Sequence, residues 1–143
     1  MSSSDAGAPP PRPARVLLVD PDPPSVRLVL AVLSTEDFRV LVAATALDAL
    51  RIAPAFQPEL VVLELILPDM NGLDLARILK SDPSTRSAAI VVLTASNGSE
   101  GLAREIGCAD YIRKPVDVLS LPARFRSHLG KKVESNGTAK GSQ

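Results

Sequence analysis

The sequence contains few of the residues on which several classes of protein depend. Its 143 residues include one cysteine, Cys108, which excludes an internal disulfide and a metal site built from several cysteines. Aromatic residues make up 3% of the chain, too few for the stacking platforms that bind single-stranded nucleic acid. Sixteen basic and sixteen acidic residues give a formal net charge of zero, so non-specific nucleic-acid binding is disfavoured.

Long apolar runs and a glycine-rich phosphate loop are also missing. No run is long enough to cross a bilayer, and the first fifteen residues, MSSSDAGAPPPRPAR, contain no apolar segment of the signal-peptide type. Prolines occupy the turn after the first apolar run, where a nucleotide-binding loop would need glycines. We therefore expect a cytoplasmic protein with no membrane or nucleic-acid partner.

The length suits one folded domain, and a hydrophobic content of 45% is enough for a packed core. Residues 1–13 are rich in Ser, Ala, Gly and Pro, so we expect them to form a disordered N-terminal arm. Residues 131–143, KKVESNGTAKGSQ, are predicted to be a disordered, solvated tail. The folded domain is then residues 14–130.

Within that domain, short apolar runs alternate with patterns of helical period, which predicts βαβ units and a parallel sheet. The predicted strands are 16–19, 38–42, 60–63, 90–93 and 111–112. Helices are predicted at 26–33, from Ala46 to about Ala53 with Pro54 near its end, after Gly72, at 99–106, and over Val118–Leu129.

The stretch Pro58–Gly72, PELVVLELILPDMNG, organises the rest of the chain. Its apolar run is typical of a central strand buried on both faces, and the acid Glu64 stands where the run ends. Polar residues also close the other predicted strands: Asp20 with Asp22 nearby, Thr94, and Lys114. Because parallel strands end at one edge of a sheet, we expect these side chains to converge on one pocket.

These residues resemble the receiver domain of bacterial two-component response regulators. The resemblance covers residues 15–130 and rests on four motifs: RVLLVDPD at 15–22, LVVLELILPDMNG at 60–72, IVVLTAS at 90–96, and ADYIRKP at 109–115. It implies a flavodoxin-like, doubly wound α/β fold whose five parallel strands have the order 2-1-3-4-5, with helices on both faces. Short flanks favour a stand-alone receiver.

The resemblance also implies a mechanism. In the family, an aspartate after the third strand accepts a phosphoryl group while acids after the first strand hold Mg²⁺. Mapped onto this chain, Thr94 is the switch hydroxyl, Lys114 the phosphate-binding lysine and Tyr111 the switch aromatic. Asp20, Asp22, Glu64 and the carbonyl of Ile66 are the metal positions. The Lys114–Pro115 bond is expected to be cis.

Two positions depart from the family pattern. The phosphoacceptor position is Glu64 instead of Asp, and the second acid of the metal pair is Pro21. Glutamate places its carboxylate roughly 1.5 Å further out, beyond the tolerance of a positioned nucleophile. We expect a Glu64–Lys114 pair to hold the pocket without phosphate or metal, so that no cofactor is required and Mg²⁺ binding is weak. This describes an atypical, or pseudo-receiver, domain that is not an enzyme.

The expected partner is a signalling protein, either a histidine kinase or a downstream effector. It would bind the face formed by Asn97–Gly107, Tyr111 and Val118–Leu129. Two alternatives stay open at this point. One is a receiver that catalyses its own phosphorylation on Glu64 or another acid with Mg²⁺; the other is an unrelated flavodoxin-like nucleotide or cofactor binder.

Three further residues are interpreted as structural. Cys108 is expected to be a small residue packed between a helix and a strand, and His128 a surface or groove residue on the last helix. Asp69 is expected to form the turn after Pro68.

Overall fold

The computed structural model describes residues 12–34 and 37–129. The predicted C-terminal tail and most of the predicted N-terminal arm lie outside these residues. Five parallel strands form one sheet in the order β2-β1-β3-β4-β5, which confirms the predicted fold and strand order. The strands are β1 (Ala14–Val19), β2 (Phe38–Ala43), β3 (Leu60–Leu63), β4 (Ala89–Thr94) and β5 (Asp110–Arg113).

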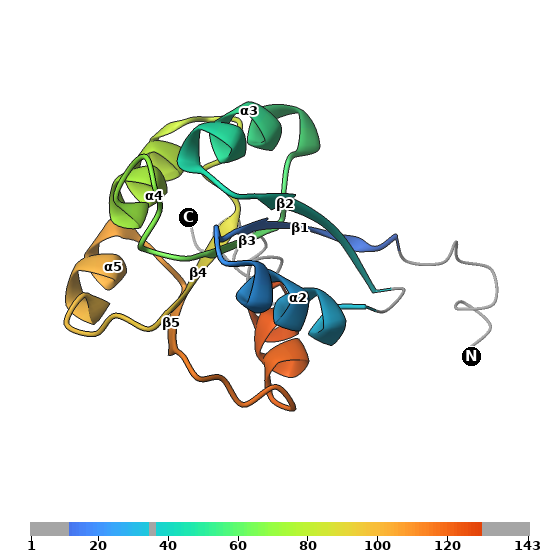
Figure 1. Cartoon of the computed structure of the whole chain (residues 1–143). Coiled ribbons are helices and arrows are strands. Elements are labelled where there is room, and N and C mark those ends of the chain that lie inside the picture. Colours follow the sequence, from blue (N-terminus) through green and yellow to red (C-terminus); the bar gives the residue numbers. More distant parts are fainter. Residues whose placement is uncertain (1–11, 35–36, 130–143) are drawn as a thin grey trace, which may run out of the picture.

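Helices cover both faces of the sheet (Figure 1). They are α2 (Pro23–Val32), α3 (Ala46–Phe56), α4 (Gly72–Ser81), α5 (Glu100–Ile106) and a last helix over residues 121–129. One face packs against α3 and α4, and α5 continues this layer beside β4 and β5. The other face packs against α2 and the 121–129 helix. No helix in the described part of the chain has the length and apolar character needed to span a membrane.

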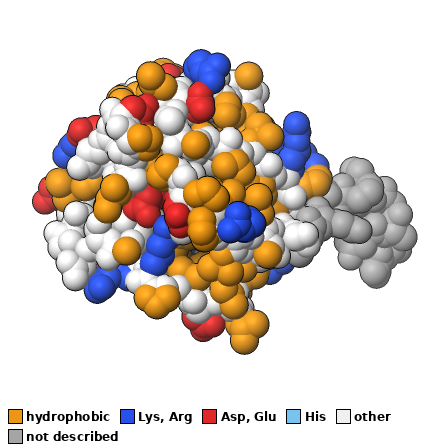
Figure 2. Space-filling model, viewed as in Figure 1, with side chains coloured by type: hydrophobic (Ala, Val, Ile, Leu, Met, Phe, Trp, Pro, Cys, Tyr) orange, Lys and Arg blue, Asp and Glu red, His pale blue; other side chains and the backbone are white. Residues whose placement is uncertain are grey.

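The core lies between these layers. β3 is fully buried along its whole length, as its unbroken apolar sequence predicted. Leu17 and Val19 of β1 face α3, whereas Val16 and Leu18 face α2, because successive strand residues point to opposite faces. Glu64 therefore directly follows a strand whose side chains are all buried in the core. In the space-filling view, acidic and basic side chains meet near the middle of the visible face, and apolar side chains surround them (Figure 2).

Two predicted helix boundaries are shifted. Pro54 lies near the end of α3, as predicted, and the helix continues to Phe56 instead of ending at about Ala53. Proline removes only one amide donor there, and the buried Phe56 ring together with the bond from the Gln57 amide to the Ala53 carbonyl (2.8 Å) completes the last turn. Val118 is not helical: it lies exposed in a turn, and the last helix begins at residue 121.

Candidate functional site

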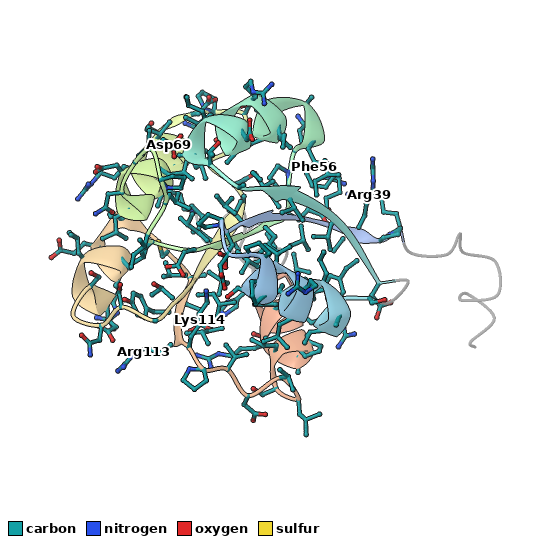
Figure 3. The ribbon with its side chains drawn as sticks, viewed as in Figure 1. Arg39, Phe56, Asp69, Arg113 and Lys114 are labelled. Carbon is teal, nitrogen blue, oxygen red and sulfur yellow. The ribbon has the colours of Figure 1, made fainter. Side chains whose placement is uncertain are left out.

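The strand register brings the predicted polar residues to one edge of the sheet. Val19 of β1 is level with Leu63 of β3, so Asp20 and Glu64, which follow them, are neighbours. Thr94 ends β4, and its partner in β5 is Arg113, the residue before Lys114. Figure 3 shows Lys114 directed inward at this edge and Arg113 directed away from the molecule. Asp20, Glu64, Thr94 and Lys114 therefore meet, as predicted.

Lys114 joins three elements through its ammonium group. Its Nζ lies 2.9 Å from Glu64 Oε1, 3.2 Å from Asp20 Oδ2 and 2.9 Å from Ser25 Oγ. A lysine ammonium has three N–H donors, so each donor has an acceptor. Ser25 was not predicted as a site residue, because its place after two prolines in the sequence is typical of a turn. Only the packing of the first turn of α2 shows that its hydroxyl reaches Lys114.

Glu64 is equally well supplied with donors. Its Oε2 accepts hydrogen bonds from the amides of Leu65 (2.7 Å) and Ile66 (3.2 Å) and from the Thr94 hydroxyl. Burial raises the pKa of Glu64, but the hydrogen bonds from Thr94 and Lys114 outweigh it and hold the pKa below its ordinary value. Glu64 is therefore a carboxylate whose two oxygens are both engaged by the protein.

The charge state of Lys114 follows from the same contacts. Burial lowers the pKa of this ammonium, whereas the hydrogen bond to Glu64 and the nearby charge of Asp20 raise it, and the net direction is upward. The Lys114–Pro115 peptide bond is cis, as expected from the sequence. The cluster is thus one cation held between two largely buried anions.

The residues predicted as metal positions are engaged in contacts within the protein. Asp20 Oδ1 accepts the Asp22 amide at 2.9 Å, and its other oxygen faces Lys114. The Asp22 carboxylate accepts the Ser25 amide at 3.2 Å and caps α2, and Pro21 has no ligand atom in its side chain. Among residues 12–34 and 37–129, no three His, Cys, Asp or Glu side chains are grouped to hold a metal ion. These residues do not fit a tightly bound Mg²⁺, because Lys114 already lies between the two acids.

A tight turn fixes the amides that bind Glu64. The Gly72 amide donates to the Leu65 carbonyl at 2.8 Å, and a Cβ on Gly72 would lie 2.6 Å from both the Glu64 carbonyl oxygen and the Leu65 Cα. Only glycine fits this approach.

Asp69 lies in this turn, as predicted, and also has a second role. Its carboxylate accepts the Ala46 and Leu47 amides at 2.9 and 3.0 Å, which ties the turn to the start of α3.

Tyr111 is connected to the cluster through the segment after β4. Its phenol donates to the Ser96 carbonyl at 2.9 Å, and the Ser96 amide donates to the Thr94 hydroxyl at 3.3 Å. Burial, together with the negative charge of Glu100, raises the pKa of Tyr111. Thr94 therefore serves as a donor toward Glu64 and as an acceptor toward the loop that Tyr111 contacts.

The residues interpreted as structural have mixed outcomes. Cys108 is half buried and packs beside α5 and β5, as predicted, and burial raises the pKa of its thiol. His128 is not a surface residue: it is 7% exposed, and its Nε2 lies 2.9 Å from Asp110 Oδ2. The helical spacing alone could not show this, because the acid that holds His128 comes from a strand.

Comparison with known proteins identifies the fold family. Residues 16–126 match the response regulator receiver domain, which is most of the folded chain. This chain belongs to the response regulator receiver family. It is therefore a receiver domain of two-component signalling, and the alternative of an unrelated flavodoxin-like nucleotide binder is set aside.

Three similar proteins illustrate the relationship. The receiver is 38% identical over 118 residues to the response regulator PleD of Caulobacter vibrioides, covering 80% of this chain and 26% of PleD. It is 38% identical over 117 residues to the DNA-binding response regulator MtrA of Mycolicibacterium smegmatis, covering 80% of this chain and 50% of MtrA. The chain thus spans a quarter to a half of the length of these relatives. The BeF3-activated N-terminal receiver domain of Klebsiella pneumoniae RstA has a TM-score of 0.72 and 32% identity, over 80% of this chain and 97% of that one.

Proposed function

We propose that this receiver is a pseudo-receiver: it acts in phosphorelay-type signalling through protein–protein contacts and is not phosphorylated at residue 64. The observation that carries the proposal is the closed Lys114–Glu64 cluster. Lys114 has no donor left for an incoming oxygen, and both Glu64 oxygens already accept hydrogen bonds from the protein. Before the Glu64 carboxylate could attack a phosphoryl group, it would have to give up its hydrogen bonds within the protein.

The same contacts support a receiver that needs no cofactor and binds Mg²⁺ weakly. A metal ion beside residue 64 would have to displace the Lys114 ammonium from Asp20 and Glu64, and Pro21 offers no oxygen in compensation. Asp22 would have to leave its capping position on α2 to act as a ligand. Lys114 already brings one positive charge to these two carboxylates.

The conformation is proposed to be fixed or biased, without full imitation of a phosphorylated receiver. Glu64 carries one negative charge, whereas a phosphoryl group carries about −1.5 to −2. Moving a two-state equilibrium from 1:99 to 99:1 takes about 5.5 kcal/mol, more than one partly solvated ion pair supplies. Glu64 thus provides a permanent hydrogen-bond acceptor for Thr94 and Lys114, with less negative charge than a phosphoryl group.

The proposed docking face for a signalling protein is the one predicted from the sequence: Asn97–Gly107, Tyr111 and the region Val118–Leu129. A cavity of about 260 Å³ opens on this face; its lining is Glu100, Ala103, Arg104, Cys108, Ala109, Asp110 and Tyr111. Leu102 and Leu119 are exposed apolar side chains on the same segments, at 43% and 88% exposure. Apolar groups beside a polar hollow are typical of protein-binding surfaces.

The proposal is tested by incubating the protein with acetyl phosphate and Mg²⁺ and measuring the intact mass. We expect no added phosphoryl group. A stoichiometric adduct that hydroxylamine removes would favour the alternative, a receiver that phosphorylates Glu64 or another acid. The Glu64→Gln variant is the matched control, because an adduct that persists in it is located elsewhere.

A further inference from the structure

A second charged cluster lies at the start of β5, on the side of Tyr111 away from Glu64. Asp110 accepts four hydrogen bonds there. Arg124 contributes two as a fork, from Nε to Oδ2 at 2.8 Å and from Nη2 to Oδ1 at 2.9 Å. His128 Nε2 lies 2.9 Å from Oδ2, and the Tyr111 amide donates to Oδ1 at 2.8 Å. One carboxylate thus joins the switch position to two residues of the last helix.

The Asp110 carboxyl group is ionised at neutral pH. Burial raises the pKa of Asp110, but the hydrogen bonds from Arg124 and His128 outweigh this effect and lower the pKa to about 2. An ionised carboxylate only accepts, so the hydrogen bond from His128 requires the proton on Nε2. His128 is 7% exposed, which keeps water from replacing Asp110 as its partner.

The junction extends the chain of contacts that begins at Glu64. Thr94 donates to Glu64 and accepts the Ser96 amide, and the Tyr111 phenol donates to the Ser96 carbonyl. The backbone of Tyr111 then meets Asp110. These hydrogen bonds, joined through the covalent structures of Ser96 and Tyr111, connect Glu64 with the Asp110 carboxylate.

We propose that Asp110 is a positioning residue that couples Tyr111 to the 121–129 helix, so that this helix reports the state of the Glu64 cluster to a partner. The coupling rests on the proposed function, because it assigns the signalling output of the same cluster. Arg124 and His128 are one helical turn apart, and both form hydrogen bonds with the Asp110 carboxylate. Phe125, buried between them in sequence, keeps that side of the helix against the sheet.

Contact alone does not demonstrate coupling, so the test must measure it. The chain is suited to this because it has one tyrosine, one histidine and no tryptophan. Tyr111 fluorescence and the imidazole NMR signals of His128 are therefore unambiguous probes of the two sides of Asp110. Both are read in the full chain at a fixed pH.

The experiment perturbs Glu64 and reads both probes with and without Asp110. We expect Glu64→Gln to shift the Tyr111 emission and the His128 signals in the wild-type background. In an Asp110→Asn background, Tyr111 should still respond and His128 should lose its response. Asp117→Asn, which removes an exposed acid just before the same helix, is the matched control and should preserve both responses.

Two results would overturn the coupling: a His128 response of full size in the Asp110→Asn background, or Glu64→Gln leaving His128 unchanged in the wild type. Should Asp110→Asn unfold, Arg124→Gln removes the fork from a half-exposed side chain and must also diminish the His128 response. The mass measurement decides phosphorylation independently. A failed coupling test with no phosphoryl adduct would thus reject the role of Asp110 and leave the pseudo-receiver proposal standing.

Discussion

Lys114 Nζ lies 2.9 Å from Glu64 Oε1, and we propose that this ion pair takes the place of a bound phosphoryl group. The pair is largely buried, with side-chain exposures of 20% and 10%. Its lysine comes from the end of β5 and its glutamate from the end of β3, so it links two strands across the carboxyl edge of the sheet. We expect the stability of the domain and its lack of phosphorylation to depend on this contact.

Removing the lysine should be costly, because it leaves two carboxylates without their cation. We expect Lys114→Met to lower the free energy of unfolding by about 3 kcal/mol, near the lower limit for breaking a buried ion pair. Glu64→Gln should cost less, because Gln keeps an acceptor for Thr94 and leaves Lys114 paired with Asp20. Urea unfolding of both single variants and the double variant gives the coupling energy. A coupling indistinguishable from zero would show that the pair does not stabilise the fold.

The pair should also shape the pH dependence of stability. The pKa of Glu64 is lowered by folding, so its contribution is present above its ordinary value of 4.5 and is lost as the pH falls below it. The pKa of Lys114 is raised, so its contribution is present below 10.5 and is lost as the pH rises past that value. The difference in unfolding free energy between wild type and Glu64→Gln should therefore be flat near neutrality and shrink at low pH. A difference that grew on acidification would contradict the direction assigned to Glu64.

Restoring the family residues should restore the chemistry only in combination. Glu64→Asp shortens the carboxylate but leaves Pro21 without a metal ligand, so we expect no phosphoryl adduct with acetyl phosphate and Mg²⁺. Glu64→Asp combined with Pro21→Asp supplies both the acceptor and the missing acid, and it should be phosphorylated at least in part. Intact mass measures both variants. Adduct formation, or beryllofluoride binding, by Glu64→Asp alone would show that Pro21 is not what limits the site.

Two glycines offer a paired test of the turn behind Glu64. A methyl group on Gly72 would meet backbone atoms at 2.6 Å, so Gly72→Ala should destabilise the domain by about 3 kcal/mol, at the upper end for overpacking. Gly101 lies in α5 with nothing within 4 Å of its missing Cβ, so Gly101→Ala should stabilise by up to about 1 kcal/mol. Thermal unfolding compares the two variants. Equal effects at both positions would show that the close backbone contact at Gly72 does not require glycine.

The parallel sheet and the residues at its edge were predictable from the local pattern of the sequence, whereas the strand order was predicted only from the resemblance to the receiver family. Apolar runs fix the strands, and parallel strands must end together, so the pattern alone places Asp20, Glu64, Thr94 and Lys114 at one edge. Ser25 and the Asp110–His128 contact were not predictable in this way. They depend on how the helices pack against the sheet. Ser25 is 89 residues from Lys114 in the chain, and His128 is 18 residues from Asp110. Likewise, the position of Asp69 in a turn did not reveal that it binds the amides that begin α3.

A crystal structure of the protein grown with Mg²⁺ and beryllofluoride tests most directly whether the Lys114–Glu64 cluster is closed to phosphoryl chemistry. We expect Lys114 to remain bound to Glu64, Asp20 and Ser25, and neither ion to occupy the cluster. A metal ion coordinated by Asp20 and residue 64, or beryllium attached to the Glu64 carboxylate with Lys114 displaced, would contradict it.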